Sequence, residues 1–348
     1  MQAVVFEGPF HVSVKERPLP HLQDSRDVII KVGATALCGS ELHVYRGHQK
    51  SDAGFIMGHE FTGIVSKVGA DVQTVQVGDR VVSPFTVSCG ECFYCSRGFT
   101  ARCERSLLFG SSSLDGGQAE YVRVPFADGT VIKAPDTISD RALLLMADIF
   151  PTGYFGVKSA LQLSPNIDVT TSTIVVIGCG PVGLCAIACA SSVRPRHLFA
   201  VDAIDSRLEL ARNLGAKPLN YKLDPDGMKR QILEATEGRG ADMVVEVVGQ
   251  SPALRTAFEL VRPFGAISSI GVHNANIPWT GSEAYSKNIR LQMGRCPVRH
   301  VFGEALVVLE RIQQDLEFMF DHVMPLTEAT EGYEMFDKMK VQKVIFRP

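Results

Sequence analysis

The stretch that decides the fold is TIVVIGCGPVGLCAIACASS, residues 173–192. It begins with an uninterrupted apolar run typical of a buried strand, turns through glycines, and continues as a helix-forming run of small apolar residues. Glycine is required where a chain turns this tightly and where its backbone must approach a pyrophosphate at a helix N-terminus. The sequence therefore predicts a dinucleotide-binding turn. Its residues are Gly178, Gly180, Pro181, Val182 and Gly183.

Asp202 closes the next apolar run, LFAVD (198–202), about 20 residues after Gly183. A carboxylate at this point accepts hydrogen bonds from the ribose hydroxyls of adenosine and repels a 2'-phosphate, so NAD is favoured over NADP. Arg207 lies near enough in the sequence to leave NADP as the less favoured cofactor. The alternative is a glycine turn that serves only helix packing, and Asp202 argues against it.

The same rhythm of strand, turn and helix continues towards the C-terminus. Apolar runs at 243–248 and 266–272 alternate with helix-like segments, which predicts a parallel sheet covered by helices on both faces. Residues 1–150 differ, because short β-type runs such as 61–69 are broken there by Gly and Pro. After about residue 295 the pattern is mixed. The predicted fold is α/β, with a mostly antiparallel β-domain joined to a doubly wound parallel-sheet domain.

Length and composition exclude several classes of protein. At about 150 residues per domain, 348 residues give roughly two domains. Hydrophobic residues make up 45% and charged residues 21%, and a net charge of -3 provides no field that would steer the chain to nucleic acid or anionic lipid. The N-terminus does not resemble a signal peptide, and no run of about 18 apolar residues is present. We therefore expect a cytoplasmic protein without nucleic-acid or membrane partners.

Four cysteines lie close together in CGECFYCSRGFTARC. Four thiolates at this spacing can close a tetrahedron around a structural zinc ion, and clustered thiols in a reducing cytosol bind metal more often than they pair. Two alternatives are four free thiols and a zinc ribbon that binds nucleic acid or protein. The polar, Gly-containing loop disfavours the first, and the near-neutral charge disfavours the second. The predicted ligands of this zinc lobe, residues 88–104, are Cys89, Cys92, Cys95 and Cys103.

A second group of metal-binding residue types lies in the β-domain. Cys38 begins CGSELH (38–43), and His59 lies in GHE (58–60). A catalytic zinc ion needs about three protein ligands and one open position, and a thiolate with an imidazole supplies two of them. Taken alone, this pair does not distinguish a metal site from an ordinary hydrogen-bonded histidine.

Several motifs spread along the chain point to one family. They are ALCGSELHVYRG (36–47), GHEFTGIVSKVG (58–69), GDRVV (78–82), the four-cysteine lobe, DIFPTGYFG (148–156) and VVIGCGPVGL (175–184). Together they resemble the zinc-dependent medium-chain alcohol dehydrogenase family over essentially the whole chain. The resemblance implies a GroES-like catalytic domain formed by residues 1–150 and 295–348, and a Rossmann NAD-binding domain at 151–294.

The resemblance also implies a catalytic zinc ion held by Cys38, His59 and a third ligand just before the TGY turn. That third position is Asp148, where many relatives have cysteine, so the chain departs towards the formaldehyde-dehydrogenase-like branch. A carboxylate in place of a thiolate keeps the ligand charge and hardens the donor set, which still suits zinc. Glu60 corresponds to a carboxylate that approaches the metal during ligand exchange. With the four-cysteine lobe, two zinc ions per subunit are expected.

The chemistry implied by the resemblance is hydride transfer between an alcohol and NAD. Zinc binds the alcohol oxygen and stabilises the alkoxide, hydride passes to NAD, and the proton leaves through Ser40 and His43. In the reverse direction an aldehyde or ketone is reduced by NADH. Thr152 corresponds to a residue that packs on the nicotinamide, and Lys343 corresponds to one that reaches the pyrophosphate.

The expected partner is a small-molecule alcohol or aldehyde, whose identity the resemblance leaves open. Pairing through the last strand of the parallel sheet, around 290–294, would give a homodimer, and the short catalytic domain favours a homotetramer. Two other functions remain. One is a zinc-free reductase of activated double bonds on the same scaffold, which the metal-binding residues argue against. The other is a non-redox nucleotide-binding relative, which the retained proton-relay residues argue against.

Overall fold

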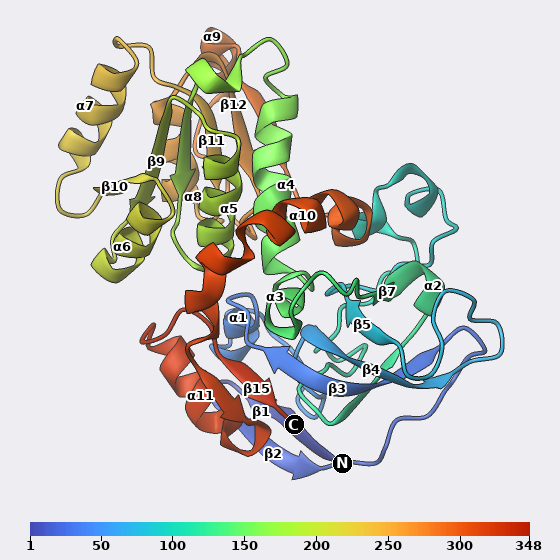
Figure 1. The fold of residues 1–348 in the computed structure, drawn as a ribbon. Coiled ribbons are helices and arrows are strands. Elements are labelled where there is room, and N and C mark those ends of the chain that lie inside the picture. Colours follow the sequence, from blue (N-terminus) through green and yellow to red (C-terminus); the bar gives the residue numbers. More distant parts are fainter. The chain divides into compact units, whose positions relative to one another are not determined.

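The chain folds into two units, and the computed structural model describes residues 1–348 (Figure 1). Unit 1 consists of Met1–Pro151 and Pro297–Pro348, so its two segments are separated in the sequence by the whole of unit 2, Thr152–Cys296. Unit 1 contains a mostly antiparallel sheet, and unit 2 contains a parallel sheet. The α/β fold class predicted from the sequence is confirmed.

Unit 1 is built on strands and short helices. Its strands are β1 (Gln2–Gly8), β2 (His11–Glu16), β3 (Val28–Ala36), β4 (Glu60–Val68), β5 (Arg80–Ser83), β6 (Tyr121–Val124), β7 (Ile132–Lys133), β14 (Val323–Pro325) and β15 (Ile345–Arg347). Its helices are α1 (Glu41–Tyr45), α2 (Ala127–Thr130), α3 (Asp140–Leu145), α10 (Val298–Ile312) and α11 (Ala329–Asp337). The main sheet has the order β14-β15-β3-β4-β5-β7, β6 also pairs with β3, and β1 and β2 form a separate hairpin.

The register of β3 brings distant residues to one edge of the sheet. Ala36 at the end of β3 lies opposite Glu60, the first residue of β4. Cys38 therefore leaves the sheet at the edge where His59 approaches it. On the other side β15 runs antiparallel to β3, with its first residue also opposite Ala36, and this pairing brings Lys343 to the same edge.

Two large apolar clusters contribute to the core of unit 1. One packs against the main sheet and includes Phe61 and Phe109, whose rings meet edge to face with centroids 5.1 Å apart. The other joins the β1–β2 hairpin, α1 and α11. Along α11, the buried residues Ala329, Tyr333 and Phe336 recur at helical spacing, so one face of the helix enters the core. Burial of each large side chain contributes roughly 1.5–3 kcal/mol.

Unit 2 alternates strands with helices. Its strands are β8 (Thr173–Ile177), β9 (His197–Asp202), β10 (Lys217–Asn220), β11 (Ala241–Glu246), β12 (Val261–Ser269) and β13 (Arg290–Met293), and its helices are α5 (Pro181–Ser192), α6 (Asp205–Asn213), α7 (Pro225–Ala235), α8 (Ser251–Leu260) and α9 (Gly281–Lys287). Helix α4 (Ile149–Gln162) begins in unit 1 and continues into unit 2. The strands are parallel, in the order β10-β9-β8-β11-β12-β13. Every residue of β8 is buried, as expected near the centre of a parallel sheet.

The strand predicted at 266–272 ends earlier, because β12 stops at Ser269. The chain bends away at Gly271, where it packs directly on the backbone of Gly249. A Cβ atom at Gly271 would lie 2.2 Å from the Gly249 nitrogen. This close contact could not be inferred from an apolar run alone.

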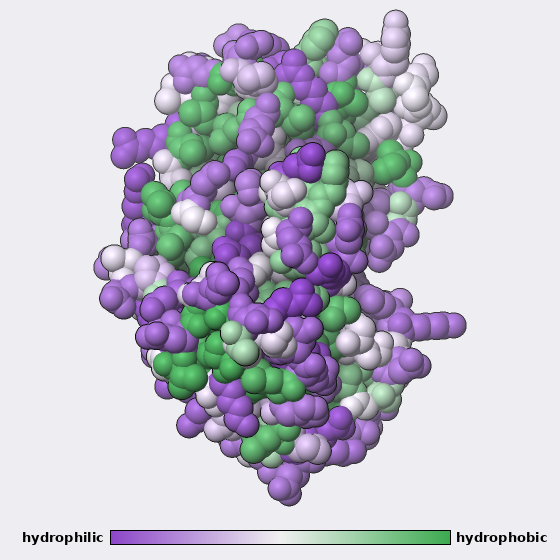
Figure 2. Space-filling view, turned by 90° about the vertical axis from the view of Figure 1, so that its right-hand side faces the viewer, coloured by the Kyte–Doolittle hydropathy of each residue, from purple (hydrophilic) through white to green (hydrophobic).

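The surface mixes polar and apolar side chains. On the face drawn in Figure 2, hydrophilic (purple) and hydrophobic (green) residues are interspersed. Phe93, Phe99 and Tyr285 are among the exposed large apolar side chains. Such exposure is ordinary, because folded proteins lack enough polar atoms to cover their surface. None of the helices combines the length and apolar character needed to cross a bilayer.

Candidate active site

Four candidate metal ligands from three segments of unit 1 meet in one buried cluster. Cys38 follows β3, His59 and Glu60 lie at the start of β4, and Asp148 immediately precedes α4. One ligand atom from each residue lies within 4.8 Å of those of the others. Asp148 Oδ2 is 3.5 Å from Cys38 Sγ and 3.4 Å from His59 Nε2. The structure thus brings together the three residues that the resemblance names as ligands, and it adds Glu60 beside them.

These spacings suit a tetrahedral zinc ion. Zinc bonds of about 2.0–2.3 Å place tetrahedral ligand atoms about 3.3–3.8 Å apart, and both distances from Asp148 lie in that range. Glu60 Oε1 is buried without a hydrogen-bond donor, and a nearby cation would stabilise an anionic oxygen of this kind. Thiolate, imidazole and carboxylate are all donors that zinc accepts.

The electrostatics of the cluster also favour a cation. Burial, followed by two nearby carboxylates, raises the pKa of the Cys38 thiol. Burial likewise raises the pKa of Glu60 to about 7. Burial by itself lowers the pKa of His59, but Glu41 and Cys38 raise it well above its ordinary value. Acidic groups are therefore crowded together out of water, where a divalent ion would stabilise their charged forms.

Lys343 lies in this cluster as the counter-ion of Glu60. Its side chain is fully buried, and its Nζ forms an ion pair with Glu60 Oε2. The neighbouring segment is fixed beside β3, because the Leu37 N–H donates to the Val344 carbonyl at 2.9 Å. Burial lowers the pKa of Lys343, but Glu60 and Cys38 raise it overall, so the ammonium group stays charged. The structure thus pairs Lys343 with Glu60, and the predicted contact with the pyrophosphate stays a prediction.

Ser40 borders the candidate ligand atoms. Its Oγ lies 3.3 Å from Cys38 Sγ and 3.4 Å from His59 Nε2. The residue immediately precedes α1, and its hydroxyl makes no capping hydrogen bond with that helix. A hydroxyl at this position can pass a proton to or from the oxygen of a substrate held by the cluster.

His43 lies in the middle of α1 and is half-buried. Its ring centroid is 6.3 Å from that of His48, which is exposed. Burial lowers the pKa of His43, and the charges of His48 and Arg46 lower it further. The neutral ring is therefore favoured, as a proton acceptor requires.

Glu41 is a site residue that the sequence analysis missed. Its Oε2 accepts a hydrogen bond from the Cys38 N–H at 2.8 Å, and its Oε1 lies 3.9 Å from His59 Nδ1. Burial raises the pKa of Glu41, while His59 and the Cys38 N–H oppose that shift. A carboxylate behind a ligating histidine orients the ring so that its other nitrogen faces the metal. The available signal was an acidic residue three positions after Cys38, which the following turn brings back to the Cys38 backbone.

The four-cysteine lobe forms a second cluster, with all four sulfur atoms within 4.8 Å of one another. Cys92 Sγ and Cys103 Sγ are 4.0 Å apart. The Cys89 and Arg105 N–H groups donate to Cys103 Sγ at 3.2 and 3.3 Å. Hydrogen bonds from backbone amides lower the pKa of the Cys92 thiol to about 6. Burial raises the pKa of Cys95 to about 12 and also raises that of Cys103. A bound cation would stabilise these two as thiolates, so the lobe fits a four-sulfur zinc site.

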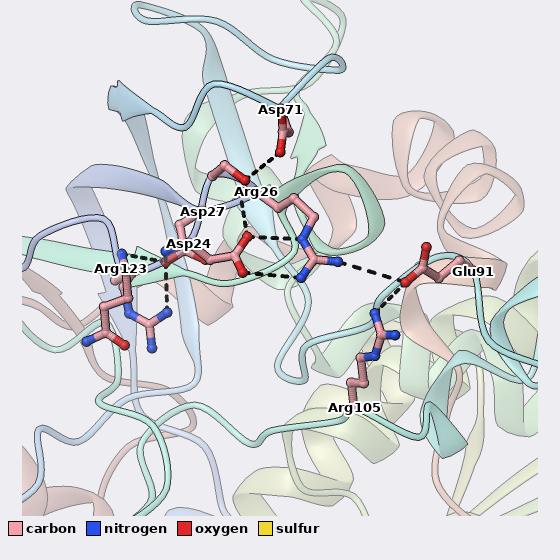
Figure 3. Close-up of polar contacts among 9 residues, drawn as sticks. Asp24, Arg26, Asp27, Asp71, Glu91, Arg105 and Arg123 are labelled. Carbon is pink, nitrogen blue, oxygen red and sulfur yellow. Dashed lines mark hydrogen bonds and ion pairs between the residues drawn. The ribbon is translucent and has the colours of Figure 1, made fainter.

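Charged side chains attach the lobe to the rest of unit 1 (Figure 3). Glu91, between the first two cysteines, pairs with Arg105 and lies 3.9 Å from Arg26 Nη1. Arg26 also lies over the Phe126 ring, 4.5 Å from its centroid, and its hydrogen bonds lower the pKa of Asp24 to about 2. Exposed ion pairs contribute little individually. The stability of the lobe is therefore expected to depend mainly on its four sulfur atoms and not on these ion pairs.

The glycine turn of unit 2 has the geometry of an anion site. Gly178 has φ +96°, and a Cβ there would lie 2.8 Å from Val248 Cγ2. A Cβ at Gly183 would lie 1.8 Å from the Gly178 carbonyl oxygen, so helix and turn can pack only with glycine. Gly180, by contrast, faces open space at the N-terminus of α5. That N-terminus would attract a phosphate group.

Asp202 lies directly against this turn at the end of β9. Its Oδ2 accepts a hydrogen bond from the Cys179 N–H at 2.7 Å, and its Oδ1 accepts from the Ala203 and Ile204 N–H groups at 2.7 and 2.9 Å. The carboxylate is thereby held in one orientation beside the turn. Its position fits an acid that binds the adenosine ribose.

The other predicted cofactor residues lie on helices of unit 2. Burial raises the pKa of the Cys179 thiol and Arg207 partly opposes this shift, so the Arg207 guanidinium is near the glycine turn. Thr152 is half-buried on α4. The next residue, Gly153, packs on α5, where an added Cβ would lie 2.6 Å from the Ala186 nitrogen.

Comparison with known proteins identifies the family. The model of the alcohol dehydrogenase GroES-like domain matches residues 24–136, and that of the zinc-binding dehydrogenase domain matches residues 181–311. Zinc-type alcohol dehydrogenase B of Aspergillus flavus is 59% identical over 347 residues, which cover 100% of this chain and 81% of that protein. The chain belongs to the zinc-type alcohol dehydrogenases. This dehydrogenase is an oxidoreductase that acts on CH–OH donors, and the predicted enzyme class is confirmed.

The dehydrogenase is also similar to more distant members of the family. Formaldehyde dismutase of Pseudomonas putida is 31% identical over 399 residues, covering 100% of this chain and 97% of that protein. Among solved structures, alcohol dehydrogenase TADH from Thermus sp. ATN1 has a TM-score of 0.93 at 37% identity, covering 100% of this chain and 99% of that one. The similarity thus extends over both units of the dehydrogenase.

Proposed function

We propose that this dehydrogenase transfers hydride between a small alcohol and NAD, and in reverse between NADH and an aldehyde or ketone, at a zinc ion held by Cys38, His59 and Asp148. The observation that carries this proposal is the convergence of these three side chains, with ligand atoms 3.4 and 3.5 Å from Asp148 Oδ2. A zinc ion at this position supplies positive charge that lowers the pKa of a substrate hydroxyl. A second, structural zinc ion is assigned to the four-cysteine lobe.

The residues around the cluster would divide the remaining tasks. Ser40, within 3.4 Å of two of the proposed ligands, accepts the proton of the substrate hydroxyl. His43 accepts it in turn and releases it to solvent, because its ring is neutral near physiological pH. Glu60 and Lys343 form a buried ion pair that keeps one carboxylate beside the ligands. Glu41 orients the His59 ring.

The substrate class follows from the third ligand and from the relatives. Asp148 in place of a thiolate supports the formaldehyde-dehydrogenase-like branch, and the similarity to a formaldehyde dismutase agrees with that assignment. We therefore propose small alcohols and aldehydes, including formaldehyde or its adducts, as substrates. We also propose that the protein forms a homodimer or homotetramer in which the edge strand β13 pairs with its copy in a second subunit.

The direct test is a spectrophotometric assay of the zinc-loaded protein. NAD is mixed with a panel of primary and secondary alcohols. NADH is mixed with a panel of aldehydes and ketones that includes formaldehyde, and with a panel of compounds that carry an activated double bond. Formation or consumption of NADH supports the proposal. Activity confined to compounds with an activated double bond would indicate the zinc-free reductase instead, and no redox activity with any compound would contradict dehydrogenase function.

Cofactor preference is expected to depend on Asp202. Replacing Asp202 with alanine removes the acceptor for the ribose hydroxyls and the charge that repels a 2'-phosphate. We expect the KM for NAD to rise by about tenfold or more, while the KM for NADP changes less. Asp205→Ala, which removes a nearby carboxylate from the start of α6, is the matched control. An unchanged ratio of the two KM values in Asp202→Ala would remove this residue from the ribose site.

The pH dependence of turnover is expected to reflect His43. The base acts only when neutral, and its pKa is lowered by burial, His48 and Arg46, so turnover should persist below pH 6.5 before it falls. His48→Asn removes one of the charges that lower this pKa, and the acidic limb of kcat should therefore move to higher pH. His43→Gln should lower kcat by about tenfold or more. A kcat profile that none of these changes alters would contradict the relay.

A further inference from the structure

A buried hydrogen-bonded chain runs from α11 to Glu41, whose carboxylate faces the candidate ligand His59. The Tyr333 hydroxyl donates to Gln118 Oε1 at 2.9 Å. Gln118 Nε2 donates to Glu41 Oε1 at 3.3 Å, and the same oxygen lies 3.9 Å from His59 Nδ1. Tyr333 and Gln118 are 0% exposed, and Glu41 is 5% exposed, so water does not replace these contacts.

The chemistry of the three side chains determines which group donates and which accepts each hydrogen bond. A carboxylate accepts hydrogen bonds and does not donate them, so the NH₂ group of Gln118 must face Glu41. The carbonyl oxygen of Gln118 must then face Tyr333, whose hydroxyl supplies the matching donor. Burial raises the pKa of Tyr333, so the hydroxyl keeps that proton. The Gln118 amide therefore has a single favourable orientation between Tyr333 and Glu41.

Gln118 is also packed against the loop that carries His59. Its N–H donates to the Met57 carbonyl at 2.9 Å. Gly58 has φ +100°, and a Cβ there would lie 2.5 Å from Gln118 Cγ. The Gln118 side chain is thus packed tightly against the backbone of this loop at Gly58. Tyr333 comes from a helix that contains none of the candidate ligands.

We propose that Gln118 and Tyr333 are positioning residues for the catalytic metal site, acting through Glu41 on the ligand His59. The proposal rests on the proposed function, because it takes Cys38, His59 and Asp148 as the zinc ligands. Tyr333 holds the Gln118 amide in the orientation that Glu41 requires. Gln118 in turn fixes the carboxylate that faces His59 Nδ1, and Nε2 is left directed at Asp148 Oδ2, 3.4 Å away.

Substitution of Gln118 or Tyr333 should weaken zinc binding by the ligand His59 without removing this ligand. Partners of ligating histidines typically change metal affinity by about 10- to 100-fold when they are lost. We expect zinc release from the catalytic site to accelerate about tenfold in Tyr333→Phe. In Gln118→Leu, which also removes the donor to Glu41, we expect acceleration of about 10- to 100-fold. Zinc in the four-cysteine lobe should be released at the wild-type rate in both variants.

The experiment follows zinc transfer from the full-length protein to a chromogenic chelator, with total zinc measured before and after. Cys38→Ala identifies the phase that belongs to the catalytic site, because that phase disappears in this variant. Tyr45→Phe is the matched control: Tyr45 lies in the same apolar cluster, with its ring centroid 5.1 Å from that of Tyr333, but outside the hydrogen-bonded chain. Its release rates should equal those of the wild type.

A double-mutant cycle of Tyr333→Phe with Glu41→Gln tests whether Tyr333 acts on zinc release through Glu41. If Tyr333 acts through Glu41, Tyr333→Phe should accelerate release by less than about twofold in the Glu41→Gln background. Selective acceleration of the catalytic-site phase that disappears in that background supports the proposal. Equal acceleration of both zinc phases, or a lower unfolding temperature with unchanged release rates, would show a merely structural role and overturn it.

Failure of the inference can be separated from failure of the proposed function. A wild-type protein with two zinc ions, one of them lost in Cys38→Ala, whose release is unchanged by Tyr333→Phe and Gln118→Leu would overturn the inference alone. A wild-type protein without any zinc ion that Cys38→Ala removes would overturn both.

Discussion

Replacing Cys38 with alanine is expected to lower kcat/KM by at least about a thousandfold while the protein stays folded. The thiolate is one of three proposed ligands, and its loss leaves His59 and Asp148 with too few donors to hold a zinc ion in a catalytic geometry. The four-cysteine lobe should keep the ion proposed for it, so we expect zinc content to fall from two ions to one per subunit. Steady-state kinetics with the best alcohol, zinc analysis and circular dichroism measure these three outcomes.

Three further variants make this test more specific. Cys189→Ala removes a different buried thiol, from α5, and should retain two zinc ions and most of the activity. Asp148→Cys restores a thiolate at the third position and should retain the ion, whereas Asp148→Asn should lose most of it. Full activity of Cys38→Ala with a single zinc ion would place the chemistry elsewhere.

The second large effect is expected in the four-cysteine lobe. Cys103→Ser should lower the free energy of unfolding by more than about 3 kcal/mol, because a structural zinc site contributes its binding energy to folding. At a few degrees per kcal/mol, the unfolding temperature should fall by about 10 °C. The kcat of the protein that remains folded should change much less than in Cys38→Ala. Calorimetry and zinc analysis provide the measurement.

The same Cys189→Ala variant controls for the loss of a thiol as such. Arg105→Ala controls for the lobe's ion pair with Glu91, and its effect should be small, since exposed pairs contribute little. A Cys103→Ser protein with two zinc ions and wild-type stability would show that these cysteines do not bind metal.

Much of the fold could be predicted because its signals are local. The glycine turn at 178–183 follows an apolar strand, and Gly178 and Gly183 each have a distinct steric reason in the structure. The change from broken β-type runs to alternating strands and helices marked two kinds of sheet correctly. Short-range spacing also grouped the four cysteines, because residues this close in sequence need only a tight loop to meet.

The candidate active site was harder to predict, because it is assembled by strand register. Asp148 was named as a ligand only through the family resemblance, because sequence spacing alone does not show that it lies 3.5 Å from Cys38, which is 110 residues away. The pairing of Lys343 with Glu60 could not be predicted for the same reason, since the burial of Lys343 follows from the pairing of β15 with β3 and not from its neighbours in the sequence. Gln118 and Tyr333 reach Glu41 only through contacts between residues far apart in the sequence, so neither of them forms a motif.

The ion pair between Glu60 and Lys343 has a consequence for synthesis of the protein. Its two members are separated by 283 residues, and at roughly 5–20 residues per second a ribosome needs about 15–60 s to make that length. During this interval the nascent first segment must keep Glu60 hydrated or bound to something other than its lysine. The Glu60–Lys343 pair can therefore form only after residue 343 has been synthesised, and hence after the whole of unit 2.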